Sequence, residues 1–265
     1  MKFPIVNLVV TVFLLWLTIQ LNSEIEVYLA YVFILTVGIL HGANDLSLIN
    51  YIKKGSGDSQ LKYIGFYVGV IAIMSLAFFH FPFTALSIFI AFSCYHFGEQ
   101  HFYSQLRSSN FKTGVLFMSY GFLIFNLLFY LNAEETTSII YELAEVTIPK
   151  SYYLFGLLFA SVTTFVMIVA NRKNFISGFA FFKEVFLLIL FALLFKLASL
   201  LWAFAIYFVI WHSLPSLKDQ TLALHGQIDK SSFIKYFKSS AINWLISIVG
   251  LAVIYYISTL MDIRF

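Results

Sequence analysis

The sequence predicts an all-α integral membrane protein, a polytopic bundle of about nine transmembrane helices that forms a single domain over residues 1–265. Of the 265 residues, 61% are hydrophobic and only 11% are charged, whereas soluble domains carry about 25% charged residues. Apolar windows long enough to span a bilayer recur along the chain, and they lack the period-two alternation of a membrane barrel. The apolar composition leads us to expect a lipid bilayer around the protein. Because the formal net charge is only +3, we expect no nucleic acid as partner.

The expected spans follow one another with short loops between them. They are residues 5–22, 26–44, 61–80, 83–103, 114–131, 152–170, 176–195, 198–215 and 240–260. The first follows Lys2 closely and lacks a small-residue cleavage signal, so we interpret it as a retained helix and not as a signal peptide. The seventh and eighth are divided at Lys196 and Ser199, because one helix over residues 185–214 would be longer than a bilayer is thick.

Lysine and arginine residues divide unevenly between the two sets of loops. If the N-terminus is cytoplasmic, all 16 of them except Lys150, Lys196 and Arg264 fall on the cytoplasmic side. This asymmetry follows the positive-inside rule. It predicts a multi-pass protein of the inner (plasma) membrane with a cytoplasmic N-terminus, and it places the acidic loop 132–151 outside.

Among the ionisable side chains within the spans or at their ends, three short clusters stand out, and such residues are costly in a membrane unless they are paired or functional. They are His41 and Asp45 at the end of the second span, His96, Glu99 and His101 late in the fourth, and His212 at the end of the eighth. The single cysteine, Cys94, excludes a disulfide framework and a cysteine-built zinc site.

Three of these histidines share one depth in the predicted topology. His41, His96 and His212 each come roughly 13 to 15 residues after their helix enters from outside, which at about 1.5 Å per residue is about 20 Å. Because imidazoles are common ligands of transition metals, three of them at one depth predict a shared metal site. Asp45 and Glu99 would then be the carboxylates that hydrogen-bond metal-bound histidines. The alternative for both is a structural hydrogen bond between helices.

The remaining histidines have simpler interpretations. His80 lies beside Phe81 in an expected outer turn, and His225 lies in an expected cytoplasmic loop, so both are interpreted as structural or solvated. Gly42 and Gly98 stand close to histidines and would permit close helix contact there, as small residues do in many membrane helices.

At these residues the chain resembles the Brp/Blh family of membrane beta-carotene 15,15'-dioxygenases. The matching segments, in the family's order, are His41-Gly with Asp45, Tyr95-His-Phe-Gly-Glu99, and Trp211-His-Ser-Leu214. The resemblance implies a non-haem iron centre held by histidines, O2 as co-substrate, and symmetric cleavage of beta-carotene or a related apolar carotenoid, with retinal as product. An all-imidazole donor set suits Fe(II) better than Mg²⁺ or Ca²⁺, which prefer oxygen ligands.

Two positions depart from the family's pattern. The third motif usually continues to a second histidine, where this chain has Ser216, and the second motif often ends in aspartate, where this chain has His101. His101 is therefore a candidate fourth ligand. Five residues of undistorted helix turn it roughly 140° away from His96, so that only a kink or π-bulge would bring both to one metal. The alternative is a three-histidine site completed by water or a carboxylate.

Two other classes of function stay open. A different histidine-metal membrane oxidase acting on lipid or carotenoid would also place histidines at cytoplasmic helix ends, although diiron desaturases usually need more than the 6 present here. A non-enzymatic protein, such as a proton-coupled transporter or an accessory protein, could use His41, Asp45, His96 and Glu99 as a proton relay. A transporter is expected to show inverted repeats and broken helices, and the sequence shows neither.

Overall fold

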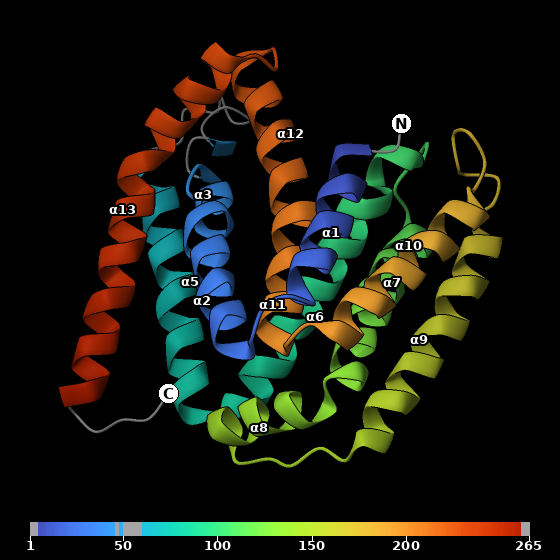
Figure 1. Ribbon diagram of the computed structural model, residues 1–265. Helices are drawn as coiled ribbons and strands as arrows, with labels where there is room; N and C mark the ends of the chain where they lie inside the picture. The colour runs from blue at the N-terminus through green and yellow to red at the C-terminus, as the bar shows by residue number, and fades with distance from the viewer. Residues whose placement is uncertain (1–4, 46–47, 50–59, 261–265) are drawn as a thin grey trace. The chain divides into compact units, whose positions relative to one another are not determined.

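The computed structural model describes residues 5–45, 48–49 and 60–260, and this part of the chain is almost entirely helical (Figure 1). The α-helices are α1 (Ile5–Thr18), α2 (Ser23–Phe33), α3 (Ile39–Gly42), α5 (Gln60–His80), α6 (Pro82–Phe102), α7 (Phe111–Leu131), α8 (Ala133–Ala144), α9 (Lys150–Ala170), α10 (Phe181–Leu197), α11 (Leu200–Tyr207), α12 (Leu214–His225) and α13 (Lys230–Leu260). Two π-helical segments, η1 (Ile34–Gly38) and η3 (Phe208–Ser213), and one 3₁₀ turn, η2 (Tyr103–Gln105), complete the helical structure. The all-α prediction is confirmed.

Every predicted apolar window coincides with a helix or a run of joined helices. Among the described residues, 5 stretches are by themselves long and apolar enough to cross a membrane. They are Ser23–Gly42, Phe111–Leu131, Lys150–Ala170, Leu200–His225 and Lys230–Tyr256. The chain is therefore a helical membrane protein, and the larger number of nine spans stays a prediction.

Helix boundaries differ from the prediction in three places. The expected loop 132–151 contains α8, which was missed because its apolar residues cover only one face and its first turn carries two glutamates. The eighth helix continues past Pro215 to His225, so His225 ends a helix and does not lie in a loop. Helix α13 begins at Lys230, well before the predicted start of the last span.

Two compact units are distinguished, each built from segments distant in sequence. The first comprises residues 1–28 and 77–207, and the second comprises 29–76 and 208–265. In the first, α7 packs against both α6 and α9, and in the second, α3 and α12 pack against α13 (Figure 1). The expectation of a single domain stays a prediction.

Close packing of α6 on α7 depends on two glycines. A methyl group at Gly98 of α6 would overlap the backbone of Phe117, and one at Gly121 of α7 would overlap the backbone of Cys94. The predicted close contact at Gly98 is therefore confirmed. At Gly42 an added methyl would meet only the Asp45 carboxylate, at 3.9 Å, among the described atoms, so the glycine there serves no comparable helix contact.

The turn that divides α10 from α11 is held by carboxylates from two other helices. Glu26 of α2 accepts a hydrogen bond from the backbone N–H of Ser199 (2.7 Å), and Glu135 of α8 accepts one from the backbone N–H of Leu200 (2.7 Å). The first N–H groups of a helix have no partner within it. Glu26, only 5% exposed, thus satisfies a donor that the membrane environment would otherwise leave unpaired.

We expect Glu26→Ala to lower the free energy of unfolding by about 1–3 kcal/mol, the usual cost of leaving a buried donor without an acceptor. Glu26→Gln keeps an acceptor oxygen and should lose less. Thermal unfolding in detergent measures both changes. Glu24, exposed in the same helical turn, provides the matched control Glu24→Ala, and equal losses from the two alanine variants would refute the capping role.

Candidate metal centre

Two of the predicted ligands, His41 and His212, lie together in the second unit. Their ring centroids are 5.2 Å apart and their planes are perpendicular, at 90°. Consider two imidazoles that bind one metal through metal–nitrogen bonds of about 2.1 Å. If the nitrogen–metal–nitrogen angle lies between a right angle and the tetrahedral angle, their ring centroids are about 4.6–5.3 Å apart. The observed separation therefore fits a pair of ligands to one ion, and His212 is buried, with 3% exposure.

Each of these histidines lies at a π-helical segment. Segment η1 ends at Gly38, one turn before His41, and η3 itself contains His212. Proline at position 215 has no N–H, and in a regular helix its ring would clash with the carbonyl of residue 211. The wider π turn directly before Pro215 accommodates this conflict. Such π-helical turns are rare and occur frequently at functional sites.

The ring of His41 is oriented by the backbone of its own helix. Its Nδ1 atom hydrogen-bonds to the carbonyl oxygen of Gly38. Because a carbonyl can only accept, Nδ1 carries the hydrogen and the lone pair of the neutral ring is on Nε2. Metal-binding histidines usually donate their other N–H to such an acceptor, so this arrangement of His41 matches that of a metal-binding histidine.

The backbone of His41 is held by side chains of α12 and α13. The Nε2 group of Gln220 donates to the carbonyl oxygen of His41 (2.9 Å), and the Tyr236 hydroxyl donates to Oε1 of Gln220 (2.6 Å). The same Nε2 group lies 3.1 Å from the hydroxyl of Ser216, the position where the related motif carries histidine. Ser216 thus contacts the side chain that positions His41. Gln220 and Tyr236 lie outside the spans expected from the sequence, so hydropathy gave no signal for either residue.

Asp45 lies just beyond α3, in a segment tied to α13. The adjacent Asn44 is fully buried and donates to the Ser240 hydroxyl (2.7 Å), while Asn243 donates to the carbonyl oxygen of Ala43 (2.8 Å). Burial raises the pKa of Asp45 to about 6. The predicted hydrogen bond from the His41 ring to Asp45 stays a prediction. The acceptor that the structure shows for the His41 ring is the backbone carbonyl oxygen of Gly38.

Phe208 packs on both imidazoles of the pair. Its ring stacks on His212, at 5.5 Å and 18°, and meets His41 edge to face, at 5.4 Å. Gly38 lies against the same ring, because a methyl group there would stand 2.9 Å from Cε1 of Phe208. The glycine therefore supplies the acceptor for His41 and also leaves room for the aromatic ring beside it. Sequence reasoning missed both residues.

We expect Gly38→Ala to reduce turnover about tenfold while the protein stays folded, because a displaced Phe208 moves the imidazoles and sub-ångström misplacement is costly in catalysis. Iron content should change little, since both histidines remain. Product formation and iron content of the purified variant measure the two effects. Gly69→Ala is the matched control, because an added methyl there meets no described atom within 4 Å. Equal turnover in the two variants would exclude this role for Gly38.

The other predicted residues, His96, Glu99 and His101, lie on α6 in the first unit. Helix α6 is α-helical from Pro82 through Phe102, so the distortion that would turn His96 and His101 to one face does not occur between them. Within either unit, the described residues contain no group of three or more histidine, cysteine or acidic side chains placed for a metal ion. Of the predicted ligands, the described structure brings together His41 and His212, in the second unit.

His101 has a partner that the sequence analysis did not identify. Its Nε2 atom is 2.8 Å from Oε2 of Glu184 on α10, and its ring stacks on Tyr120 at 4.4 Å and 20°. Glu184 is 4% exposed, and its other oxygen is 3.8 Å from Nζ of Lys183. A sequence signal was available, because Glu184 is an acidic residue within the predicted seventh span.

Comparison with known protein families shows which family the chain belongs to. The family model described as beta-carotene 15,15'-dioxygenase matches residues 32–263, which include all three histidine motifs. The chain belongs to this family. The beta-carotene 15,15'-dioxygenase assignment confirms the resemblance seen in the motifs and implies a carotenoid dioxygenase enzyme. No curated protein and no solved structure gives a significant match.

Proposed function

We propose that this chain cleaves beta-carotene at its central double bond with O2 to give two molecules of retinal. One O2 provides the oxygen atoms of both aldehydes, so the reaction balances without a further reductant. Besides the family assignment, the supporting observation is the pairing of His41 and His212 at a separation that fits one metal ion. These two residues come from the first and third of the three motifs.

The proposed cofactor is Fe(II), and the residues present fit it. His41 and His212 offer imidazole donors, and the hydrogen bond at Nδ1 of His41 places the lone pair of its neutral ring on Nε2. The second motif supplies His96 as the proposed third ligand. For the remaining position the alternatives are His101 and water or a carboxylate, and the regular geometry of α6 favours the second alternative. When bound, the iron would supply the chemistry of O2.

The chain's own residues would position the metal ligands and the substrate and would exclude water from the site. Gln220 fixes the backbone of His41, and Phe208 gives the two imidazoles an apolar neighbour. Asp45 and Glu99 are proposed to hydrogen-bond the ligand imidazoles. An apolar polyene partitions into lipid and can enter laterally between helices of a protein in the inner membrane, whose N-terminus we propose to be cytoplasmic. Placing its central bond at the metal is then a matter of positioning.

Expression in bacteria that accumulate beta-carotene tests the proposal. Orange cells should bleach and accumulate retinal, while cells that express His212→Ala at the same level should stay orange. Apocarotenoids of unequal length would contradict central cleavage and favour a different histidine-metal oxidase. Unchanged pigment in the presence of folded, iron-loaded protein would contradict the proposal altogether and favour a non-enzymatic membrane protein.

A further inference from the structure

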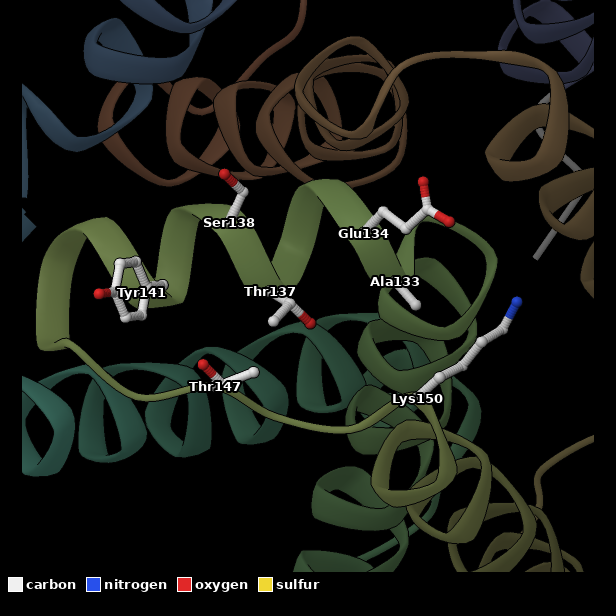
Figure 2. A pocket seen from close by; sticks show the side chains of 7 residues that line it. All are labelled: Ala133, Glu134, Thr137, Ser138, Tyr141, Thr147 and Lys150. Atoms are coloured by element: carbon white, nitrogen blue, oxygen red, sulfur yellow. The ribbon is translucent and has the colours of Figure 1, made fainter.

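A groove on the first unit lies between α8 and the segment that leads into α9 (Figure 2). It has a volume of about 570 Å³. Its polar lining residues are Glu134, Thr137, Ser138, Tyr141, Thr147 and Lys150. Figure 2 shows the two charged side chains at one end of the groove and the tyrosine ring at the other. None of these residues belongs to the candidate metal centre.

The groove lies at a membrane surface. Helix α7 ends at Leu131 and α9 begins at Lys150, and both are long and apolar enough to cross a membrane, so the segment between them connects the ends of two spans. On α8, the apolar side chains of Ile139, Tyr141 and Leu143 are exposed. Apolar and aromatic side chains on an amphipathic helix are typical of the interface between lipid tails and headgroups.

The walls of the groove are fixed in place. The Thr137 hydroxyl donates to the carbonyl oxygen of Ile148 (3.0 Å) and lies 3.1 Å from the Tyr153 hydroxyl. Ala133 and Ile140 form a buried cluster with the same tyrosine. The groove is therefore preformed, and a ligand would not have to order α8 in order to bind.

The two charges at one end of the groove have opposite sign. Within the described part of the chain, neither Glu134 nor Lys150 has an ion-pair partner. The Lys150 ammonium stands over the ring of Tyr130, 5.2 Å from its centroid, which restricts its position. A ligand that carries an anionic and a cationic group close together would complement both side chains.

We propose that the groove binds the phosphoethanolamine headgroup of a membrane phospholipid, with the phosphate at Lys150 and the ammonium at Glu134. A primary ammonium donates hydrogen bonds to a carboxylate, whereas a choline group has no N–H to donate. A glycerol headgroup carries no positive charge for Glu134. The headgroup level of the bilayer is also where the groove lies, so phospholipid headgroups surround it.

Delipidated full-length protein in detergent tests this site by native mass spectrometry and thermal unfolding. Dioleoyl phosphatidylethanolamine should bind and raise the unfolding temperature more than the corresponding phosphatidylcholine. Glu134→Gln and Lys150→Gln should each weaken that binding about tenfold or more, the expected effect of losing a charge-assisted hydrogen bond. For phosphatidylglycerol, only Lys150→Gln should weaken binding.

Matched controls are Glu142→Gln and Lys173→Gln, which make the same charge changes at exposed positions outside the groove. Equal binding of the three lipids, or binding that neither groove substitution changes, would overturn the proposal. Equally strong binding of soluble phosphoethanolamine would overturn the assignment to a lipid. None of these measurements needs iron or carotenoid, so their outcome is independent of the proposed enzymatic function.

Discussion

His212→Ala is expected to eliminate retinal formation and to remove iron from the purified protein. His212 is buried beside His41 with a geometry that fits a shared ion, and removal of one imidazole leaves too few donors to retain Fe(II). His41→Ala and His96→Ala should have the same effect if the three histidines form one site. Iron per chain by elemental analysis and retinal by chromatography measure the outcome, with about one iron per chain expected for the unchanged protein.

The same measurements separate ligands from the residues around them. Asp45→Ala and Glu99→Ala should lose about 10- to 100-fold in activity or iron affinity, as removal of a ligand's hydrogen-bond partner usually does. His80→Ala and His225→Ala should keep most activity, because His80 closes α5 at an exposed turn and His225 ends α12. Absence of iron from the unchanged protein, stoichiometric zinc with full activity, or identical behaviour of all five histidine variants would refute the site.

Helix positions were predictable from the sequence because the cost of exposing polar groups to lipid makes spans apolar. Even the division of the long apolar run was placed correctly, with α10 ending at Leu197 and α11 beginning at Leu200. Helix α8 was not predictable from hydropathy, because its exposed face carries Glu134, Glu135 and Glu142. To predict amphipathic helices at the membrane surface, the periodicity of apolar residues has to be tested in addition to the mean hydropathy.

The local geometry of the candidate site was predictable only in part. Motif order indicated His41 and His212, and the structure brings these two together. The π turns at both were not predictable, because hydropathy does not distinguish a π turn from an α turn. The fourth predicted helix, where a distortion would be needed to bring His96 and His101 to one metal, is regular. Gln220 joins α12 to α3 through one hydrogen bond, and nothing in the sequence pairs residues so far apart.

The role of His101 is the other prediction with a large expected effect, and here we expect loss of stability without loss of iron. His101 bonds to Glu184, which is 4% exposed. His101→Ala leaves that carboxylate without its imidazole partner, and breaking a buried pair costs about 3–5 kcal/mol. The 17% exposure of the histidine side chain places the expected loss near 3 kcal/mol, the lower end of that range. Thermal unfolding and iron content per folded chain test this directly.

A conservative variant separates this expectation from the alternative that His101 is a fourth ligand. The Glu184 contact alone does not decide, because a carboxylate can also orient a metal-bound imidazole. His101→Gln retains an N–H donor for Glu184 but removes the imidazole. If the contact is structural, this variant should recover most of the stability lost in His101→Ala and retain iron. If His101 is a ligand, it should lose iron as severely as His212→Ala does. We expect the first outcome, because α6 stays α-helical from His96 to His101 and turns the two rings away from one another.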